Sequence, residues 1–221
     1  MNEHNEGESP MSQQPEPYPL SFSVDYPDRP LDRLSTFFRL IAIIPIVIIL
    51  GLVMAGSFDL GRDDDFRIVG IGGGALFLAP LLMILFRQMY PRWWFDWNLG
   101  VWRFGARVSA YLFLLRDEYP STDEEQAVHL EVPYPDVPKD LNRWLPLLKW
   151  LLAFPHYIVL AVLMLLAIFV VVIAWFAIVF GGRYPRSLFD FVVGTFRWSY
   201  RVGAYAFLLS TDKYPPFRMS A

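Results

Sequence analysis

The chain has 221 residues and a net charge of −3, and 55% of its residues are hydrophobic. Because a soluble domain is normally about 45–50% apolar, the excess predicts a membrane protein. The charge shows no basic excess of the kind that marks nucleic-acid binding. Cysteine is absent, which excludes disulfides and thiol nucleophiles. The histidines His4, His129 and His156 lack metal-ligand spacing, so we expect neither a metal nor a cofactor.

Residues 1–17 are polar, acidic and contain prolines. This composition is typical of a disordered tail. A signal peptide would need a basic start followed by an apolar segment, and the tail has neither. The ordered part of the chain is therefore expected from residue 18 onward.

Two apolar segments follow, at about residues 34–55 and 68–86. Each is close to the ~20 residues that cross a hydrocarbon core of ~30 Å, so both are predicted spans. The segment between them is rich in aspartate and is expected in water. The glycine cluster at residues 70–74 lacks the Lys-Ser/Thr of a phosphate loop. It therefore indicates close packing between helices.

A third apolar region, about residues 145–180, contains only Lys149 and His156 as ionisable side chains. As one helix it would be ~54 Å long, too long for one upright span. It is either a hairpin of two short helices that turns near residues 166–169, or an interfacial segment at 144–155 followed by one long tilted helix. The lack of turn residues near Ala167 favours the long helix.

Charge placement favours the hairpin. If both ends of each apolar region lie on one side of the membrane, only Arg62 and Arg67 face the other side, and the remaining 17 basic residues share one side. Because basic residues accumulate on the cytoplasmic side, we prefer four spans with both termini cytoplasmic.

The chain also carries an internal repeat. From Tyr90 to Leu115 the sequence matches the segment 94 residues later, with 14 of 26 positions identical. After Leu115 the second segment contains one extra residue. The match then continues, with Asp117 and Tyr119-Pro120 corresponding to Asp212 and Tyr214-Pro215. We therefore predict two tandem repeats, residues 18–126 and 127–221. Each Tyr-Pro pair lies at a predicted element boundary, because proline ends a helix at the residue before it.

The segments Gly181-Gly182-Arg183-Tyr184-Pro185-Arg186 and Arg197 through Phe217 are the most distinctive of the chain. At these residues the sequence resembles the bacterial membrane proteins classed as domain of unknown function 4389. The resemblance extends over about residues 18–217. It implies a membrane location and implies no reaction or ligand.

The best-repeated feature is a helix after each Tyr-Pro-Arg, predicted at about residues 93–115 and 187–209. Its polar side chains recur at helical spacing and share one face. They form what we call the arginine stripes: Asp96, Gly100, Arg103 and Arg107 in the first repeat, and Asp190, Gly194, Arg197 and Arg201 in the second. A narrow charged stripe on an apolar, aromatic helix predicts a helix in the membrane interface.

The stripes have two interpretations. In the structural one, which we prefer, Asp96, Arg103, Asp190 and Arg197 are linked to neighbouring loops or backbone carbonyls, and the second arginine of each stripe holds lipid headgroups nonspecifically. In the functional one, the four arginines form a two-fold related pocket for an anionic headgroup, a lipid-linked sugar phosphate or an acidic segment of a partner, since guanidinium matches phosphate.

The predicted fold class is therefore an all-α integral membrane protein. Each repeat is expected to hold a transmembrane hairpin and an interfacial helix, with a possible short strand before them at residues 20–24 and 128–132. We expect these strands to pair with each other, because both alternate with period two.

The sequence predicts a non-enzymatic partner or scaffold subunit of the inner membrane, in contact with the lipid bilayer and another membrane protein. The alternative is a binder of anionic lipid headgroups or small anions that uses the stripes. A third hypothesis is an enzyme with Asp96 or Asp190 as the base, which the neighbouring arginines disfavour because they lower a carboxyl pKa. We expect no catalytic residue, and a lone His156 near a membrane entry indicates an anchor.

Overall fold

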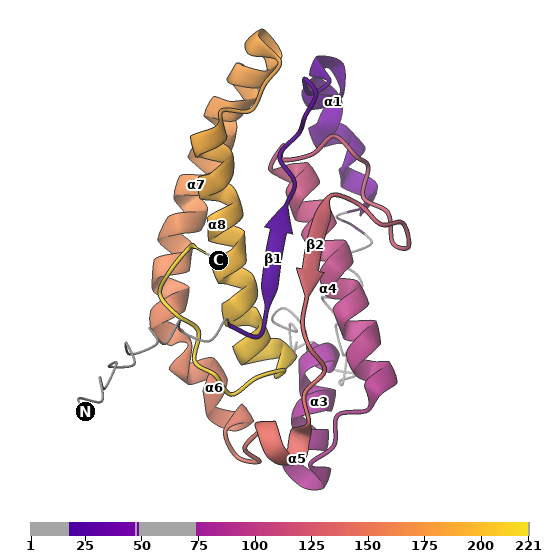
Figure 1. Cartoon of the computed structure of the whole chain (residues 1–221), viewed down its shortest axis with the longest axis vertical. Coiled ribbons are helices and arrows are strands. Elements are labelled where there is room, and N and C mark those ends of the chain that lie inside the picture. Colours follow the sequence, from indigo (N-terminus) through magenta and orange to yellow (C-terminus); the bar gives the residue numbers. More distant parts are fainter. Residues whose placement is uncertain (1–17, 47, 49–73, 221) are drawn as a thin grey trace, which may run out of the picture.

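The computed structural model describes residues 18–46, 48 and 74–220. The predicted tail and the aspartate-rich segment lie outside these residues, and so do parts of the first two apolar segments. Within the described residues the chain is mostly helical with one small sheet (Figure 1). The helices are α1 (Arg33–Ala42), α3 (Gly74–Arg87), α4 (Arg92–Leu112), α5 (Val137–Asp140), α6 (Pro146–Leu152), α7 (Phe154–Gly181), α8 (Arg186–Gly203) and the π-helix η1 (Ala204–Leu208).

The two predicted strands exist and pair with each other. Strand β1 (Ser21–Val24) runs antiparallel to β2 (Val128–Glu131), with Phe22 opposite Leu130. In each strand the buried side chains alternate with more exposed ones, as expected where one face of a sheet covers a core. The fold is therefore mostly helical with a two-stranded sheet rather than all-α.

The sheet joins the two predicted repeats in a crossed arrangement. Strand β1 of the first repeat packs on α8 of the second, and β2 of the second packs on α4 of the first. Figure 1 shows the two strands between α8 and α4, with all four elements along the long axis. Helix α1 contacts α7 at one end of the molecule, and α3 contacts α6 at the other.

The preferred hairpin for residues 145–180 is wrong. Helix α7 continues without a break from Phe154 to Gly181, through the expected turn at residues 166–169. The reason is local, since Leu166, Ala167, Ile168 and Phe169 include no glycine, proline or asparagine that would end a helix. The break lies earlier, at Ala153 between α6 and α7, close to the alternative of a short segment followed by one long helix.

Helix α7 ends at a left-handed glycine. Gly182 has φ +73° and donates its N–H to Ile178 O at 2.7 Å. This conformation strains any residue with a Cβ. The turn sends α8 back along α7, and the two helices pack side by side (Figure 1).

The predicted stripe helices are present with nearly the expected bounds, and their ends locate the inserted residue. Leu114 (φ 62°) ends the first and Leu209 (φ 56°) ends the second, so the separation there is 95 residues rather than 94. The extra residue is accommodated in the π-helix η1, as π-helical turns accommodate one additional residue. It therefore lies before Leu209, not after it as the sequence match suggested.

Candidate functional site

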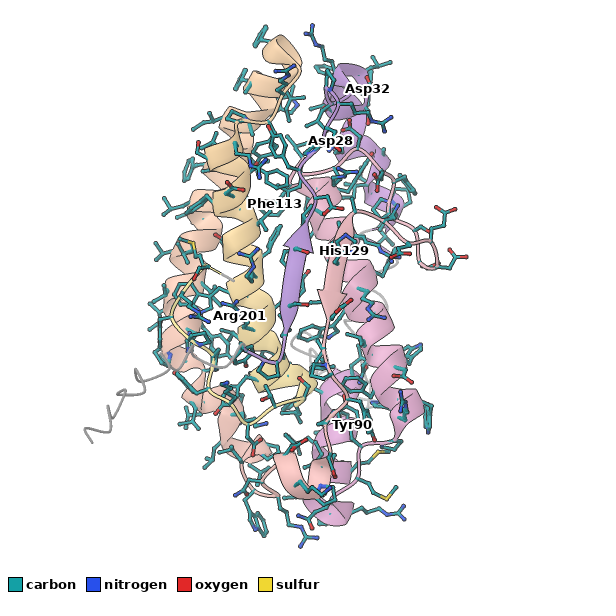
Figure 2. The ribbon with its side chains drawn as sticks, in the orientation of Figure 1. Asp28, Asp32, Tyr90, Phe113, His129 and Arg201 are labelled. Atoms are coloured by element: carbon teal, nitrogen blue, oxygen red, sulfur yellow. The ribbon has the colours of Figure 1, made fainter. Side chains whose placement is uncertain are left out.

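The arginine stripes lie on both sides of the small sheet. Arg103 and Arg107 project from α4, which packs on β2, whereas Arg197 and Arg201 project from α8, which packs on β1. Figure 2 shows Arg201 beside the lower end of β1 and His129 on the neighbouring strand. The sheet therefore separates the two pairs of arginines.

The first arginine of each stripe binds a strand of the opposite repeat. Arg103 Nε donates to Leu130 O at 2.9 Å, and Arg197 Nε donates to Phe22 O at 2.9 Å. Phe22 and Leu130 are themselves partners in the sheet. The second repeat adds one bond, from Arg197 Nη1 to Met219 O at 2.9 Å. These contacts agree with the structural interpretation for both arginines.

The second arginine of each stripe binds the segment that follows its own helix. Arg107 Nη1 donates to Ser121 O at 2.7 Å, and Arg201 Nη1 donates to Arg218 O at 3.3 Å. On both residues the Nε atom is buried and has no partner among the described residues. Binding of an anionic headgroup by these residues stays a prediction.

The aspartates of the stripes point into solvent. Asp96 pairs with Arg92 at 3.9 Å and Asp190 with Arg186 at 3.8 Å, each one helical turn away. Because both carboxylates are more than half exposed, such pairs contribute little to stability. Among the described residues, neither aspartate forms a salt bridge with Arg103 or Arg197. The aspartate and the arginines of a stripe therefore do not form one binding site.

The stripe glycines differ between the repeats. A Cβ at Gly100 would meet no atom within 4 Å, whereas one at Gly194 would lie 2.9 Å from Met219 Cβ. Only Gly194 therefore allows a close approach, and the approaching segment is the C-terminal end of the chain.

Tyrosines of the Tyr-Pro pairs make further bonds between the repeats. Tyr134 donates its hydroxyl to Tyr90 O, and Tyr26 donates its hydroxyl to Tyr184 O. An arginine lies over each of these two donor rings, with Arg92 5.5 Å from Tyr134 and Arg186 4.6 Å from Tyr26. The interpretation of the Tyr-Pro pairs as boundary residues missed this role.

Two buried ion pairs were also missed. Arg39, 1% exposed, binds Asp117, and Lys149, fully buried, binds Asp212 at 2.7 Å. Each cation lies near an aromatic ring, Tyr111 for Arg39 and Tyr205 for Lys149. The sequence contains a signal for these pairs, because Arg39 and Lys149 are isolated charges in apolar segments and occupy comparable places in the two repeats.

The cations of these pairs also bind backbone carbonyls. Arg39 Nη1 donates to Arg116 O at 3.0 Å, and Lys149 Nζ donates to Thr211 O at 2.7 Å. Burial lowers the pKa of Lys149, while the hydrogen bond and the negative charge of Asp212 oppose this effect. The charged form of Lys149 thus depends on Asp212.

His156 is bound into the fold as a hydrogen-bond acceptor. Trp198 Nε1 donates to His156 Nδ1 at 3.1 Å, and the ring of Phe217 stacks on the imidazole at 3.8 Å between centroids. The side chain is fully buried. These contacts fix the start of α7 against α8 and the C-terminal segment.

A cavity of about 280 Å³ borders the first stripe. Its lining includes Arg103 and Arg107 but also Asp123, Glu125 and Glu131, so its charge is mixed and does not favour an anion. Within residues 18–46, 48 and 74–220, no group of three or more histidine or carboxylate side chains is arranged to hold a metal ion.

Comparison with known proteins finds a family match over part of the chain. Residues 144–218 match the family described as Domain of unknown function (DUF4389). The match covers α6 to the C-terminal segment and supports membership of that family, in agreement with the resemblance. No curated protein and no solved structure matches the chain.

Proposed function

We propose that the chain is a membrane-resident, non-enzymatic protein that serves as a partner or scaffold subunit, built from two repeats joined through the central sheet. One observation carries the membrane part. Helix α7 has 28 residues and is, among the described residues, the one helix long and apolar enough to cross a membrane, yet only 11% of its most apolar window is buried. The core helix of a soluble protein would be mostly buried.

The joined repeats are supported by the recurrence of the same bonds at equivalent positions. Arg103 with Leu130 corresponds to Arg197 with Phe22, and the Tyr134 bond corresponds to the Tyr26 bond. The arginine bonds reach the strands, and the tyrosine bonds connect the two repeats outside the sheet. Their recurrence supports a structural role for these arginines and tyrosines.

Fractionation and purification test the proposal. The chain should remain in the membrane pellet after a high-salt wash, and should leave it only with detergent. A tagged chain in mild detergent should then retain a second membrane protein at a fixed ratio. Recovery in the soluble fraction would contradict the membrane part, and a chain that is always solitary would contradict the subunit part.

A second candidate, binding of anionic lipid headgroups, is favoured by the partnerless Nε atoms of Arg107 and Arg201. Native mass spectrometry of the wild type and of Arg107→Ala plus Arg201→Ala would test it. Loss of retained anionic lipid in the double variant supports binding. Unchanged retention removes the candidate, and the exposed pair Arg92→Ala plus Arg186→Ala serves as the matched control.

A further inference from the structure

Large apolar side chains are exposed along the outer helices α1, α3, α6 and α7. Examples are Phe37, Phe38, Phe86, Trp150, Phe169 and Phe176, each at least half exposed. These helices contact one another in the order α1, α7, α6, α3, and we call their exposed apolar side chains the apolar band. An exposed apolar surface of this extent is typical of contact with a membrane or a partner.

Charged side chains gather around the small sheet. The exposed side chains of Asp25, Arg103, Asp123 and Glu131 lie on or beside the sheet. Arg103, Asp123 and Glu131 line one cavity with His129, and Asp25 bonds His129 at 3.2 Å. Figure 2 shows His129 near the centre of the long axis, with Asp28 and Asp32 toward one end and Tyr90 toward the other. Arg197 lies about 17 Å along α8 from Arg186, which is about two-fifths of the ~42 Å length of α7.

A transmembrane orientation of α7 would therefore place these charges at the centre of the bilayer. An ionised side chain is costly at that depth unless it pairs or reaches water, and four of them would strongly disfavour this orientation. Helix α7 would also be about 42 Å long in a core of about 30 Å. Burying its whole length in hydrocarbon would need a tilt of about 45°, which exceeds the usual range of about 0–40°.

We infer that the axis of α7 lies parallel to the membrane plane, with the band of α1, α3, α6 and α7 immersed in one leaflet and the β1–β2 sheet facing water. This orientation rests on the membrane residence proposed above. It places Asp25, Arg103, Asp123 and Glu131 in water and leaves the apolar band in hydrocarbon. The partner of the band is thus the lipid surface itself.

The basic residues support the same orientation. At one end of α7, Arg33 lies close to Gly182, and Arg186 covers Tyr26. At the other end, Arg143 donates to Phe86 O at 3.2 Å, next to Arg87. A spanning α7 would put these groups on opposite sides of the membrane, whereas an in-plane α7 puts all of them on the cytoplasmic side, as the charge rule requires. The in-plane orientation thus keeps these basic residues on one side of the membrane, although residues 145–180 do not form the predicted hairpin.

In this orientation the two repeats lie at the same depth in the membrane, and in a spanning orientation they do not. The contact of α1 with α7 corresponds to the contact of α6 with α3 at the other end. A rotation of about half a turn around an axis through the sheet would therefore carry one repeat onto the other and exchange the two ends of the molecule. When that axis lies along the membrane normal, both repeats have the same depth, whereas a spanning α7 would invert one of them.

Cysteine labelling tests the orientation, since the chain contains no cysteine. Ser187→Cys marks the start of α8 at one end of α7, and Lys139→Cys marks α5 at the other; both side chains are exposed. Each variant is treated with a membrane-impermeant maleimide in bacterial spheroplasts and in inverted membrane vesicles. Labelling is normalised to the same sample dissolved in detergent.

The orientation predicts that both positions react in inverted vesicles and that neither reacts in spheroplasts. Ser23→Cys, on the exposed face of β1, should behave as they do, whereas Phe169→Cys should react only after detergent is added. Reaction of Ser187→Cys and Lys139→Cys from opposite sides would overturn the orientation while leaving membrane residence intact. Recovery of all variants in the soluble fraction would overturn membrane residence as well.

Discussion

The two halves of the chain are alike where they meet the sheet and different where they form the apolar band. Residues 18–126 and 127–220 make matching bonds through Arg103 and Arg197 and matching buried ion pairs. In the second half α6 and the 28-residue α7 follow each other with a break only at Ala153, whereas in the first half an aspartate-rich segment stands between α1 and α3 in the sequence. Contact with lipid tolerates such variation because it asks only for apolar side chains, whereas a bond between two polar groups needs both at fixed positions.

The largest difference between the halves is expected at the buried ion pairs. Asp117→Ala should lower the free energy of unfolding by about 3 kcal/mol, the usual cost when a buried charge loses its partner. Asp212→Ala should cost less, because Lys149 can lose its proton whereas Arg39 cannot. Denaturant unfolding in detergent micelles measures both, and equal costs would show that the two pairs are interchangeable.

The same pair of variants should differ in pH dependence. The pKa of Lys149 is already lowered by burial, and without Asp212 it should fall further. The native state then binds fewer protons than the unfolded state between that pKa and the ordinary value of about 10.5. The stability of Asp212→Ala should therefore rise with pH in this window, relative to the wild type, whereas that of Asp117→Ala should not.

The next effect is expected where α8 approaches α4. A Cβ at Gly203 would lie 2.5 Å from Trp102 Cη2, whereas a Cβ at Gly105 would meet nothing within 4 Å. Gly203→Ala should cost about 1–3 kcal/mol through overpacking. Gly105→Ala should be neutral or stabilise by up to about 1 kcal/mol, because alanine favours helix. A stabilising Gly203→Ala would mean that the repeats do not approach closely there.

A smaller effect is expected at the arginines that bind the strands. Arg197→Gln removes charged hydrogen bonds to Phe22 O and Met219 O, whereas Arg103→Gln removes one to Leu130 O. The first should cost about 2 kcal/mol and the second about 1 kcal/mol. Thermal unfolding of each single variant measures its loss of stability. A larger loss for Arg103→Gln than for Arg197→Gln would contradict the prediction.

The smallest effect is expected at the exposed pairs. Lys139 bonds Asp136 at 2.7 Å, but its side chain is 80% exposed. Lys139→Ala should leave the unfolding transition unchanged, since water replaces the lost contact. A clear loss of stability would contradict this prediction and show that the exposed pair of Lys139 and Asp136 stabilises the fold.

The strands and stripe helices could be predicted from the sequence because their patterns are local. Alternation indicated residues 20–24 and 128–132, and the repeat bounded the helices α4 and α8. The course of α7 was harder, because an unbroken apolar run fits a hairpin as well as a long helix until charge and packing are weighed. The partners of Arg39 and Lys149 lie more than 60 residues away. The repeat marks these cations and the aspartates at equivalent positions, but only the tertiary structure shows that they pair.

The candidate site was predicted in its residues but not in its arrangement. The spacing placed Arg103 and Arg107 on one face, and likewise Arg197 and Arg201. It could not show that the sheet lies between the two pairs or that backbone carbonyls accept their hydrogen bonds. Those features follow from the crossed packing of β1 on α8 and β2 on α4, which depends on tertiary structure.

Spin labels along α7 test the central claim most directly, namely that its exposed face lies in lipid at a uniform depth. Single cysteines at Leu165, Phe169, Val172 and Phe176, all exposed, would carry nitroxides in reconstituted bilayers. Collision rates with oxygen and with a water-soluble nickel chelate give the depth of each label. An in-plane α7 predicts high oxygen access and similar depth at all four positions, whereas a depth that changes steadily from Leu165 to Phe176, or free access to nickel, would contradict the account.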